Sequence, residues 1–249
     1  MPTGGRVGLF KGFDGAPLRY AIWSASRTPG RGTVCLFGGR GEYIEKYFET
    51  IADIQRRGFA VATMDFRGQG GSVRELANRR KGYVRDFADH DRDVTCFMRD
   101  IVLPDCPPPF IALGHSTGGN ILLRQATATS SWFERMVLVA PMLAFNPERV
   151  GYPQWFARSA SEAASMIGLG QIYVPGGSDL PEEMRDFEGN ALTSNHERWS
   201  RNRSILEAAP ELVLGSPTFA WMRAAYRSMA TLADAEAPAL VKVPLLIYS

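Results

Sequence analysis

Cysteine, histidine and unbalanced charge are all scarce in this chain of 249 residues. Its three cysteines, Cys35, Cys96 and Cys106, are an odd number and have no Cys-x-x-Cys spacing. This argues against a disulfide framework and a cysteine-based zinc site, and it favours buried thiols in a reducing compartment. Lysine and arginine number 28 and aspartate and glutamate 26, a net charge of +2. That balance does not indicate nucleic acid or an anionic membrane surface as the main partner.

Long apolar runs are missing as well. No stretch of about 18 uncharged apolar residues occurs, so the sequence predicts no transmembrane helix. Residues 1–6 lead into no apolar segment that would indicate a signal peptide. We therefore expect a cytoplasmic protein with at most peripheral contact with the inner face of the membrane. The length fits one large domain or one domain with an insertion.

The first 145 residues alternate short apolar runs with helical patterns. A hairpin is expected around Asp14-Gly15. The apolar runs that we expect to be buried strands are 33–37, 59–64, 110–113 and 136–140. The segments with helical character between them are 44–57, 87–101 and 120–127. Continuous apolar strands joined by helices predict an α/β fold with a mostly parallel sheet covered on both faces.

The pattern changes near residue 146. From there to about residue 240 no convincing strand is found, and the segment reads as a mainly helical insertion. One more apolar strand is expected at 243–248. The sequence therefore divides into residues 1–145, the first part of the core, residues 146–240, the insertion, and residues 241–249, a return to the core.

The strongest chemical motif is Gly114-His115-Ser116-Thr117-Gly118, which lies between an expected strand and an expected helix. A nucleophile elbow of the Gly-x-Ser-x-Gly type needs this strand–turn–helix context. The glycines permit a sharp turn that exposes the Ser116 hydroxyl, and the N–H of Thr117 can donate to a developing oxyanion. A glycine-rich turn of a phosphate-binding fold is the alternative interpretation.

A second glycine-rich segment, Gly38 to Glu42, directly follows the expected strand 33–37. Its N–H of Arg40 can be placed near Ser116 as a second oxyanion donor. The pair Gly39-x-Gly41 also allows a dinucleotide-binding interpretation. The third small residue of that pattern would fall at the bulky Ile44, which would block helix–strand contact, so we disfavour it.

Asp65 ends the expected strand 59–64, and Arg67 opens a glycine-rich turn behind it. We expect both side chains to hold the loops beside the elbow rather than to take part in the chemistry.

Taken in this order, these motifs resemble those of the α/β-hydrolases of the bacterial lysophospholipase and monoacylglycerol lipase family, which is serine aminopeptidase S33-like. Arg80-Lys-Gly-Tyr83, Ala140-Pro-Met142 and Leu192-Thr-Ser-Asn195 add to the resemblance. It implies that Ser116 is the nucleophile and that the backbone N–H groups of Arg40 and Thr117 form the oxyanion hole. It also implies that 146–240 is a cap over an acyl pocket. The supporting residues would be Gly39, Gly114, His115, Gly118, Asp65 and Arg67.

The function that the resemblance implies is cleavage of carboxylic esters of single-chain lipids, with lysophospholipase activity as the first choice. Gly38 stands where the monoacylglycerol lipases often have histidine, which favours the lysophospholipase branch. Monoacylglycerol lipase or general carboxylesterase activity is the alternative. Neither a metal nor an organic cofactor is implied, and nucleic acid is not expected as a partner. The sequence leaves the oligomeric state open.

The resemblance also places a catalytic acid after the strand that follows the cap, and a histidine after the next strand. Here the strand 243–248 is followed only by Ser249. We therefore expect a C-terminally truncated hydrolase, lacking the last strand and helices, that is inactive alone. A catalytically inactive domain that only binds lipid or protein is the second hypothesis. The histidines present are expected elsewhere: His115 directed away from the Ser116 hydroxyl, His90 on a solvated helix face and His196 at the surface.

Arg74, Arg79, Arg80, Lys81 and Arg85 form a local basic run. A solvated loop explains it, and contact with a phosphate-bearing head group is the functional alternative.

Overall fold

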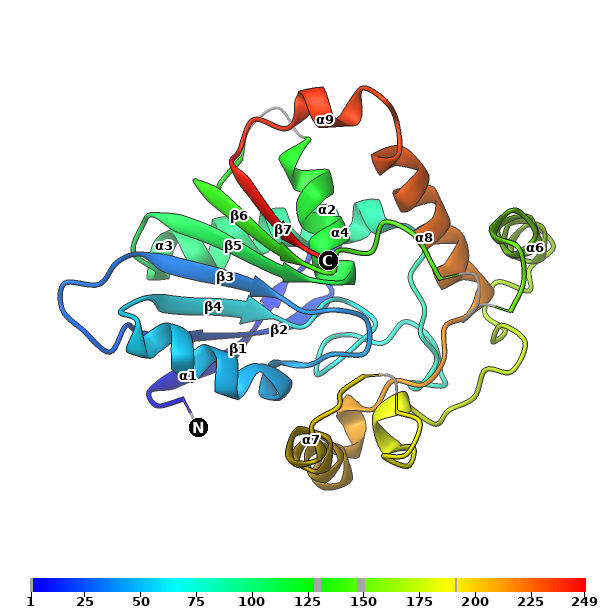
Figure 1. The fold of residues 1–249 in the computed structure, drawn as a ribbon, viewed down its shortest axis with the longest axis horizontal. Helices are drawn as coiled ribbons and strands as arrows, with labels where there is room; N and C mark the ends of the chain where they lie inside the picture. Colours follow the sequence, from blue (N-terminus) through cyan, green and yellow to red (C-terminus); the bar gives the residue numbers. More distant parts are fainter. Residues whose placement is uncertain (1, 128–130, 147–150, 191) are drawn as a thin grey trace.

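A single mixed sheet organises the molecule. The computed structural model describes residues 2–127, 131–146, 151–190 and 192–249. Within these ranges the sheet has seven strands in the order β1-β2-β4-β3-β5-β6-β7 (Figure 1). They are β1 (Gly5–Lys11), β2 (Pro17–Trp23), β3 (Thr33–Phe37), β4 (Ala60–Met64), β5 (Phe110–His115), β6 (Arg135–Val139) and β7 (Leu245–Tyr248). β1 and β2 are antiparallel to their neighbours, and the other five strands are parallel. The expected mostly parallel sheet is confirmed.

Helices cover both faces of the sheet. One face is covered by α1 (Phe48–Arg56), and the other by α2 (Phe87–Phe97), α4 (Thr117–Ala126) and α8 (Phe219–Leu232). The other α-helices are α3 (Leu103–Asp105), α6 (Gln154–Met166), α7 (His196–Ala208) and α9 (Ala237–Leu240). The expected helix 44–57 is a 3₁₀ turn over Ile44–Tyr47 followed by α1. The expected helix 120–127 begins three residues earlier, because α4 starts directly after Ser116.

Successive residues of each strand point to opposite faces, so the sheet separates two hydrophobic cores. Cys35 and Phe37 of β3 belong to the larger core, which is completed by α2, α4 and α8. Leu36, between them, belongs to the smaller core, together with Ile51 of α1. The continuous apolar run of β3 is therefore buried on both sides, as expected for a central parallel strand.

The segment after residue 146 does not stand apart as one layer. Figure 1 shows α6 and α7 at the periphery, with α8 between α6 and the sheet. Trp221, Ala225 and Met229 of α8 are part of the larger core. α7 contributes Leu206 to a separate small cluster with Tyr43. The described part of the insertion contains α6, α7, α8 and α9 joined by irregular segments, and its division from the core at residues 146 and 240 remains a prediction.

His90 corrects one expectation. It does not lie on a solvated helix face: it is only 3% exposed, and its ring meets the rings of Phe66 and Phe87 edge-on at 5.0 and 5.3 Å. Phe87, His90 and Val94 share one face of α2 at helical spacing, and that face is turned to the core. The charged neighbours in the sequence concealed this orientation.

Burial of His90 makes the fold sensitive to acid. Burial lowers the pKa of His90 to about 3, and the charges of Arg67 and Arg124 act in the same direction. The unfolded chain, where histidine keeps its ordinary pKa, then binds more protons below about pH 6.5, so stability falls as the pH falls. Between pH 7 and pH 5 the free energy of unfolding should drop by about 2 kcal/mol more than in His90→Leu. Urea unfolding of both chains at the two pH values measures this difference, and equal drops would contradict it.

In the described part of the chain, no helix has both the length and the apolar character needed to cross a membrane. All three cysteines are buried and unpaired.

Candidate active site

The carboxyl ends of three neighbouring parallel strands meet at one point of the sheet. Phe37 at the end of β3 is in register with Met64 of β4 on one side and with Gly114 of β5 on the other. The loops that follow these strands therefore leave the sheet side by side, at the edge where open α/β sheets bind ligands. They carry the motifs that were singled out in the sequence.

Ser116 occupies a sharp turn between β5 and α4. Its backbone has φ 50° and ψ −113°, a conformation that residues with a side chain rarely adopt. Backbone hydrogen bonds hold it there: its N–H donates to the carbonyl of Val139 at 3.0 Å, and its carbonyl accepts from Asn120 and Met142 at 3.0 and 2.9 Å. The strain is therefore maintained by the structure on both sides, as it is at many functional residues.

The glycines of the motif are required by close packing. A Cβ on Gly118 would overlap the carbonyl oxygen of Phe37, the last residue of β3. A Cβ on Gly114 would lie 2.7 Å from the Leu122 side chain of α4. The start of α4 thus approaches the sheet at a distance that only glycine permits.

The loop after β3 lies against Ser116. A Cβ placed on Gly39 would be 3.1 Å from Cβ of Ser116. Gly39 donates its N–H to the Glu42 carboxylate, and Gly41 donates to Oε1 of Gln69 at 3.2 Å. Between them, the N–H of Arg40 has no acceptor among the described residues. Thr117 is the first residue of α4, where helix geometry leaves the N–H without an intrahelical acceptor. Both N–H groups expected as oxyanion donors are thus available for a ligand.

Glu42 is the residue whose role sequence reasoning missed. Its carboxylate is buried and accepts from the Gly39 N–H and the Tyr47 hydroxyl, and it lies 3.0 Å from Nδ1 of His115 and 3.2 Å from Nζ of Lys46. Burial alone would raise the pKa of Glu42, but these hydrogen bonds and positive charges lower it to about 2. The carboxylate therefore stays charged and ties the loop after β3 to the elbow strand.

Asp65 and Gln69 brace the same loop from the side of β4. Asp65 accepts from the N–H of Ile44 at 3.0 Å and from Nε of Arg19 at 2.6 Å. Gln69 donates to the carbonyls of Gly39 and Glu42 at 2.8 and 3.1 Å. In the sequence, Gln69 is one polar residue of a glycine-rich turn, and nothing in that local pattern predicts its contact with the loop after β3.

Arg67 pairs with carboxylates of α2 and of the β1–β2 turn. Its Nε lies 2.6 Å from Asp93 Oδ2, and its Nη2 lies 2.9 Å from Oδ1 of the same carboxylate. Burial works against the cation, but the hydrogen bonds and charges of Asp93 and Asp14 raise the pKa of Arg67 above its usual value. This pair joins the turn after β4 to α2.

An apolar cleft of about 930 Å³ opens above Ser116. The core contributes Arg40, Ser116, Thr117, Ala140, Pro141, Met142, Ala144 and Phe145 to its lining, and Asn146 is the first lining residue of the insertion. The segment after residue 150 contributes Tyr152, Phe156, Ala157, Ala160, Ser161, Val174, Pro175, Pro217, Phe219, Trp221 and Met222. A cleft of this volume, mostly apolar with a few polar groups in its lining, is typical of a small-molecule site.

None of the three histidines is hydrogen-bonded to Ser116 in the described structure. His115 is held by Glu42, and His90 is enclosed in the core. His196 is exposed in α7, where its ring lies 5.0 Å from Phe187. The exposed position of His196 agrees with the expectation for it, whereas the direction of His115 relative to the Ser116 hydroxyl stays a prediction.

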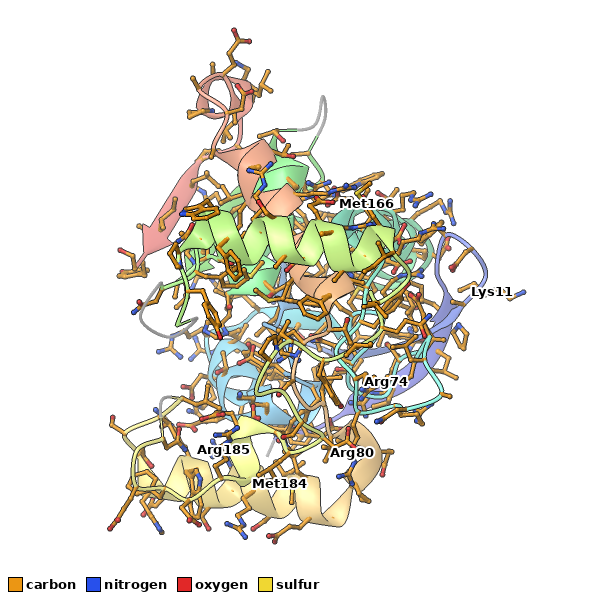
Figure 2. All side chains as sticks on the ribbon, turned by 90° about the vertical axis from the view of Figure 1, so that its right-hand side faces the viewer. Lys11, Arg74, Arg80, Met166, Met184 and Arg185 are labelled. Carbon is orange, nitrogen blue, oxygen red and sulfur yellow. The ribbon has the colours of Figure 1, made fainter. Side chains whose placement is uncertain are left out.

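The basic run divides into structural and exposed members. In Figure 2, which looks onto α6 and α7, Arg74 and Arg80 lie between these helices in projection. Arg74 donates to several backbone carbonyls, including Gly70 at 3.0 Å, and burial lowers its pKa to about 10. Arg79 and Arg80 are exposed.

The sheet topology and the strand–serine–helix turn at its carboxyl edge define an α/β-hydrolase. The chain belongs to the serine aminopeptidase S33 family, whose sequence model matches residues 28–249. This confirms the resemblance that the motifs indicated.

Individual relatives agree with this assignment. Lysophospholipase L2 of Escherichia coli K12 is 30% identical over 223 residues, which cover 86% of this chain and 61% of that protein. The monoglyceride lipase of Mus musculus is 32% identical over 136 residues, covering 54% of this chain and 43% of that protein. The chain therefore spans about three fifths or less of the length of these relatives. A soluble variant of the monoglyceride lipase from Saccharomyces cerevisiae shares the fold, with a TM-score of 0.73 and 20% identity over 99% of this chain and 77% of that one.

Proposed function

We propose that this protein is a serine hydrolase of carboxylic esters and that Ser116 is its nucleophile. The observation that carries the proposal is the strained Ser116 turn at the base of an apolar cleft, with two available N–H donors nearby. In the reaction, Oγ of Ser116 attacks the ester carbonyl carbon while its proton passes to a base. The oxyanion accepts hydrogen bonds from the N–H groups of Arg40 and Thr117. The alcohol leaves with a proton, and water then releases the acid from the acyl-enzyme.

We propose a single-chain lipid ester as the substrate, with a lysophospholipid as the first choice. The apolar lining from α6 and α8 supports an acyl chain in the cleft, and residues 146–240 would then act as its cap. The sequence similarity to lysophospholipase L2 supports the same choice. A monoacylglycerol, to which the similarity with monoglyceride lipase points, is the alternative.

No histidine of the described structure is placed to accept the proton of the Ser116 hydroxyl. A serine without a base is a weak nucleophile, so we propose that a histidine and a carboxylate outside residues 1–249 activate Ser116, as the family resemblance implies. Residues 1–249 alone would then bind esters and react with them slowly. A domain that only binds lipid is the second candidate, and the missing histidine contact is the observation in its favour.

Free imidazole can replace the missing base in a direct test. Residues 1–249 are incubated with p-nitrophenyl octanoate, with and without imidazole. We expect imidazole to raise the rate of p-nitrophenol release above the sum of the rates with protein alone and with imidazole alone. The intact mass should show one added octanoyl group, and the masses of peptides after digestion should locate it on the peptide that contains Ser116. Absence of that adduct would favour the binding domain. Rapid labelling of Ser116 by a fluorophosphonate without any added base would contradict the need for an outside histidine.

A further inference from the structure

We propose that the side chain of Arg40 recognises a phosphate group on the substrate, adjacent to the ester that Ser116 attacks. This inference rests on the proposed function and names a specificity-determining residue within it. The backbone N–H of Arg40 and its guanidinium would then serve two different parts of one ligand.

The position of the side chain supports this role. Arg40 lines the cleft that also contains Ser116. Its guanidinium carbon lies 5.3 Å from the centre of a Trp221 ring, and Nη2 donates to the carbonyl of Gly215. The guanidinium is therefore fixed between the core and the segment that covers the cleft, with its plane held by an aromatic ring.

Arg40 forms no direct ion pair, although the more distant charge of Glu183 acts on its guanidinium. No carboxylate lies within ion-pair distance of it anywhere in the described ranges, and its buried Nε has no acceptor there. Arg67, by contrast, lies against Asp93, and Arg19 lies against Asp65. Burial lowers the pKa of Arg40 to about 10. A buried cation without a carboxylate in direct contact is unfavourable, so a ligand that brings an anion to this place gains a charge-assisted hydrogen bond.

The two candidate substrates differ in the group that they would place near the Arg40 side chain. A monoacylglycerol carries a hydroxyl at the far carbon of its glycerol, and a lysophospholipid carries a phosphate there, a few bonds from the ester carbonyl. Because the N–H of Arg40 is the proposed oxyanion donor, its side chain starts beside the ester and extends within the cleft. Arginine binds phosphate with two parallel N–H donors, which a hydroxyl cannot use equally well.

A binding experiment separates this inference from the proposed function. In a Ser116→Ala chain, which prevents turnover, the affinities of 1-hexanoylglycerol 3-phosphate and 1-hexanoylglycerol are measured by calorimetry. We expect the phosphate-bearing ligand to bind at least about tenfold more tightly, as one charge-assisted hydrogen bond would give. With Arg40→Met added, the ratio of the two affinities should fall to about one, while the exposed control Arg80→Met should retain it.

The neutral ligand serves as the internal reference for an intact cleft. A ratio that survives Arg40→Met, or a ratio near one before any change to Arg40, overturns the inference, and neither result bears on acylation of Ser116. Loss of the ratio in Arg80→Met would assign the recognition to the exposed basic run instead. If Arg40→Met does not fold, Arg40→Gln keeps a donor for the Gly215 carbonyl without the charge, and the same two ratios are compared.

Discussion

Replacing Ser116 by glycine is expected to raise the free energy of unfolding by about 1 kcal/mol and to abolish imidazole-assisted ester cleavage. The backbone of Ser116, at φ 50° and ψ −113°, lies where a Cβ is strained, which costs on the order of 1–3 kcal/mol. Glycine removes that strain but gains about 1 kcal/mol of unfolded-state entropy, so a net gain of about 1 kcal/mol remains. Without the hydroxyl, p-nitrophenol release should fall to the rate of imidazole in buffer.

Ser116→Ala is the matched control, because it also removes the hydroxyl but keeps the Cβ. No intramolecular hydrogen bond of the Ser116 hydroxyl is found in the described structure, so alanine should leave stability within about 0.5 kcal/mol of the original chain. Urea unfolding then separates two variants that are equally inactive. If glycine is no more stable than alanine, the turn is not strained, and the argument that the fold stores strain at this serine fails.

The features that local sequence could reveal are those set by neighbours along the chain. Residues 34–37 of β3 are buried on both sides, and a strand interior with that environment has to be apolar. The elbow glycines could be recognised for a similar reason. The packing of α4 on β3 excludes a side chain at Gly118, so the need for glycine is evident from the residue type at that position alone. The sheet and the Ser116 turn could therefore be predicted, because each depends on a single short segment.

The features that the sequence concealed depend on partners far apart in the chain. Glu42 becomes a central contact of the site only because β5 places His115 beside it, 73 positions later. The burial of His90 is similar, since the surrounding charges of α2 suggested a solvated face and the core-facing side was set by the aromatic residues that it meets. In both cases a polar residue is buried by tertiary packing, which composition and periodicity do not report.

Loss of the Asp93 carboxylate is expected to destabilise the fold by about 3–5 kcal/mol, because it leaves Arg67 buried without its principal counter-charge. The Arg67 and Asp93 side chains are 3% and 0% exposed. Asp93 also accepts from the Phe13 N–H at 3.3 Å, so the β1–β2 turn loses a partner. In Asp93→Ala the melting temperature should fall by about 10 °C, as measured by circular dichroism.

The exposed pair of Arg6 with Asp105 provides the comparison, since its side chains are 57% and 37% exposed. Asp105→Ala should cost less than about 1 kcal/mol, and an equally small effect of Asp93→Ala would contradict the burial argument. The double variant Arg67→Met, Asp93→Leu removes both charges and should recover most of the lost stability. The main penalty in Asp93→Ala is a buried cation that keeps only its contacts with Asp14 and Glu75. Recovery of stability would show that this buried pair is not needed to hold the fold together. Arg40 differs from Arg67 in this respect. Its buried Nε has no hydrogen-bond acceptor in the described structure, and it lines the same cleft as Ser116.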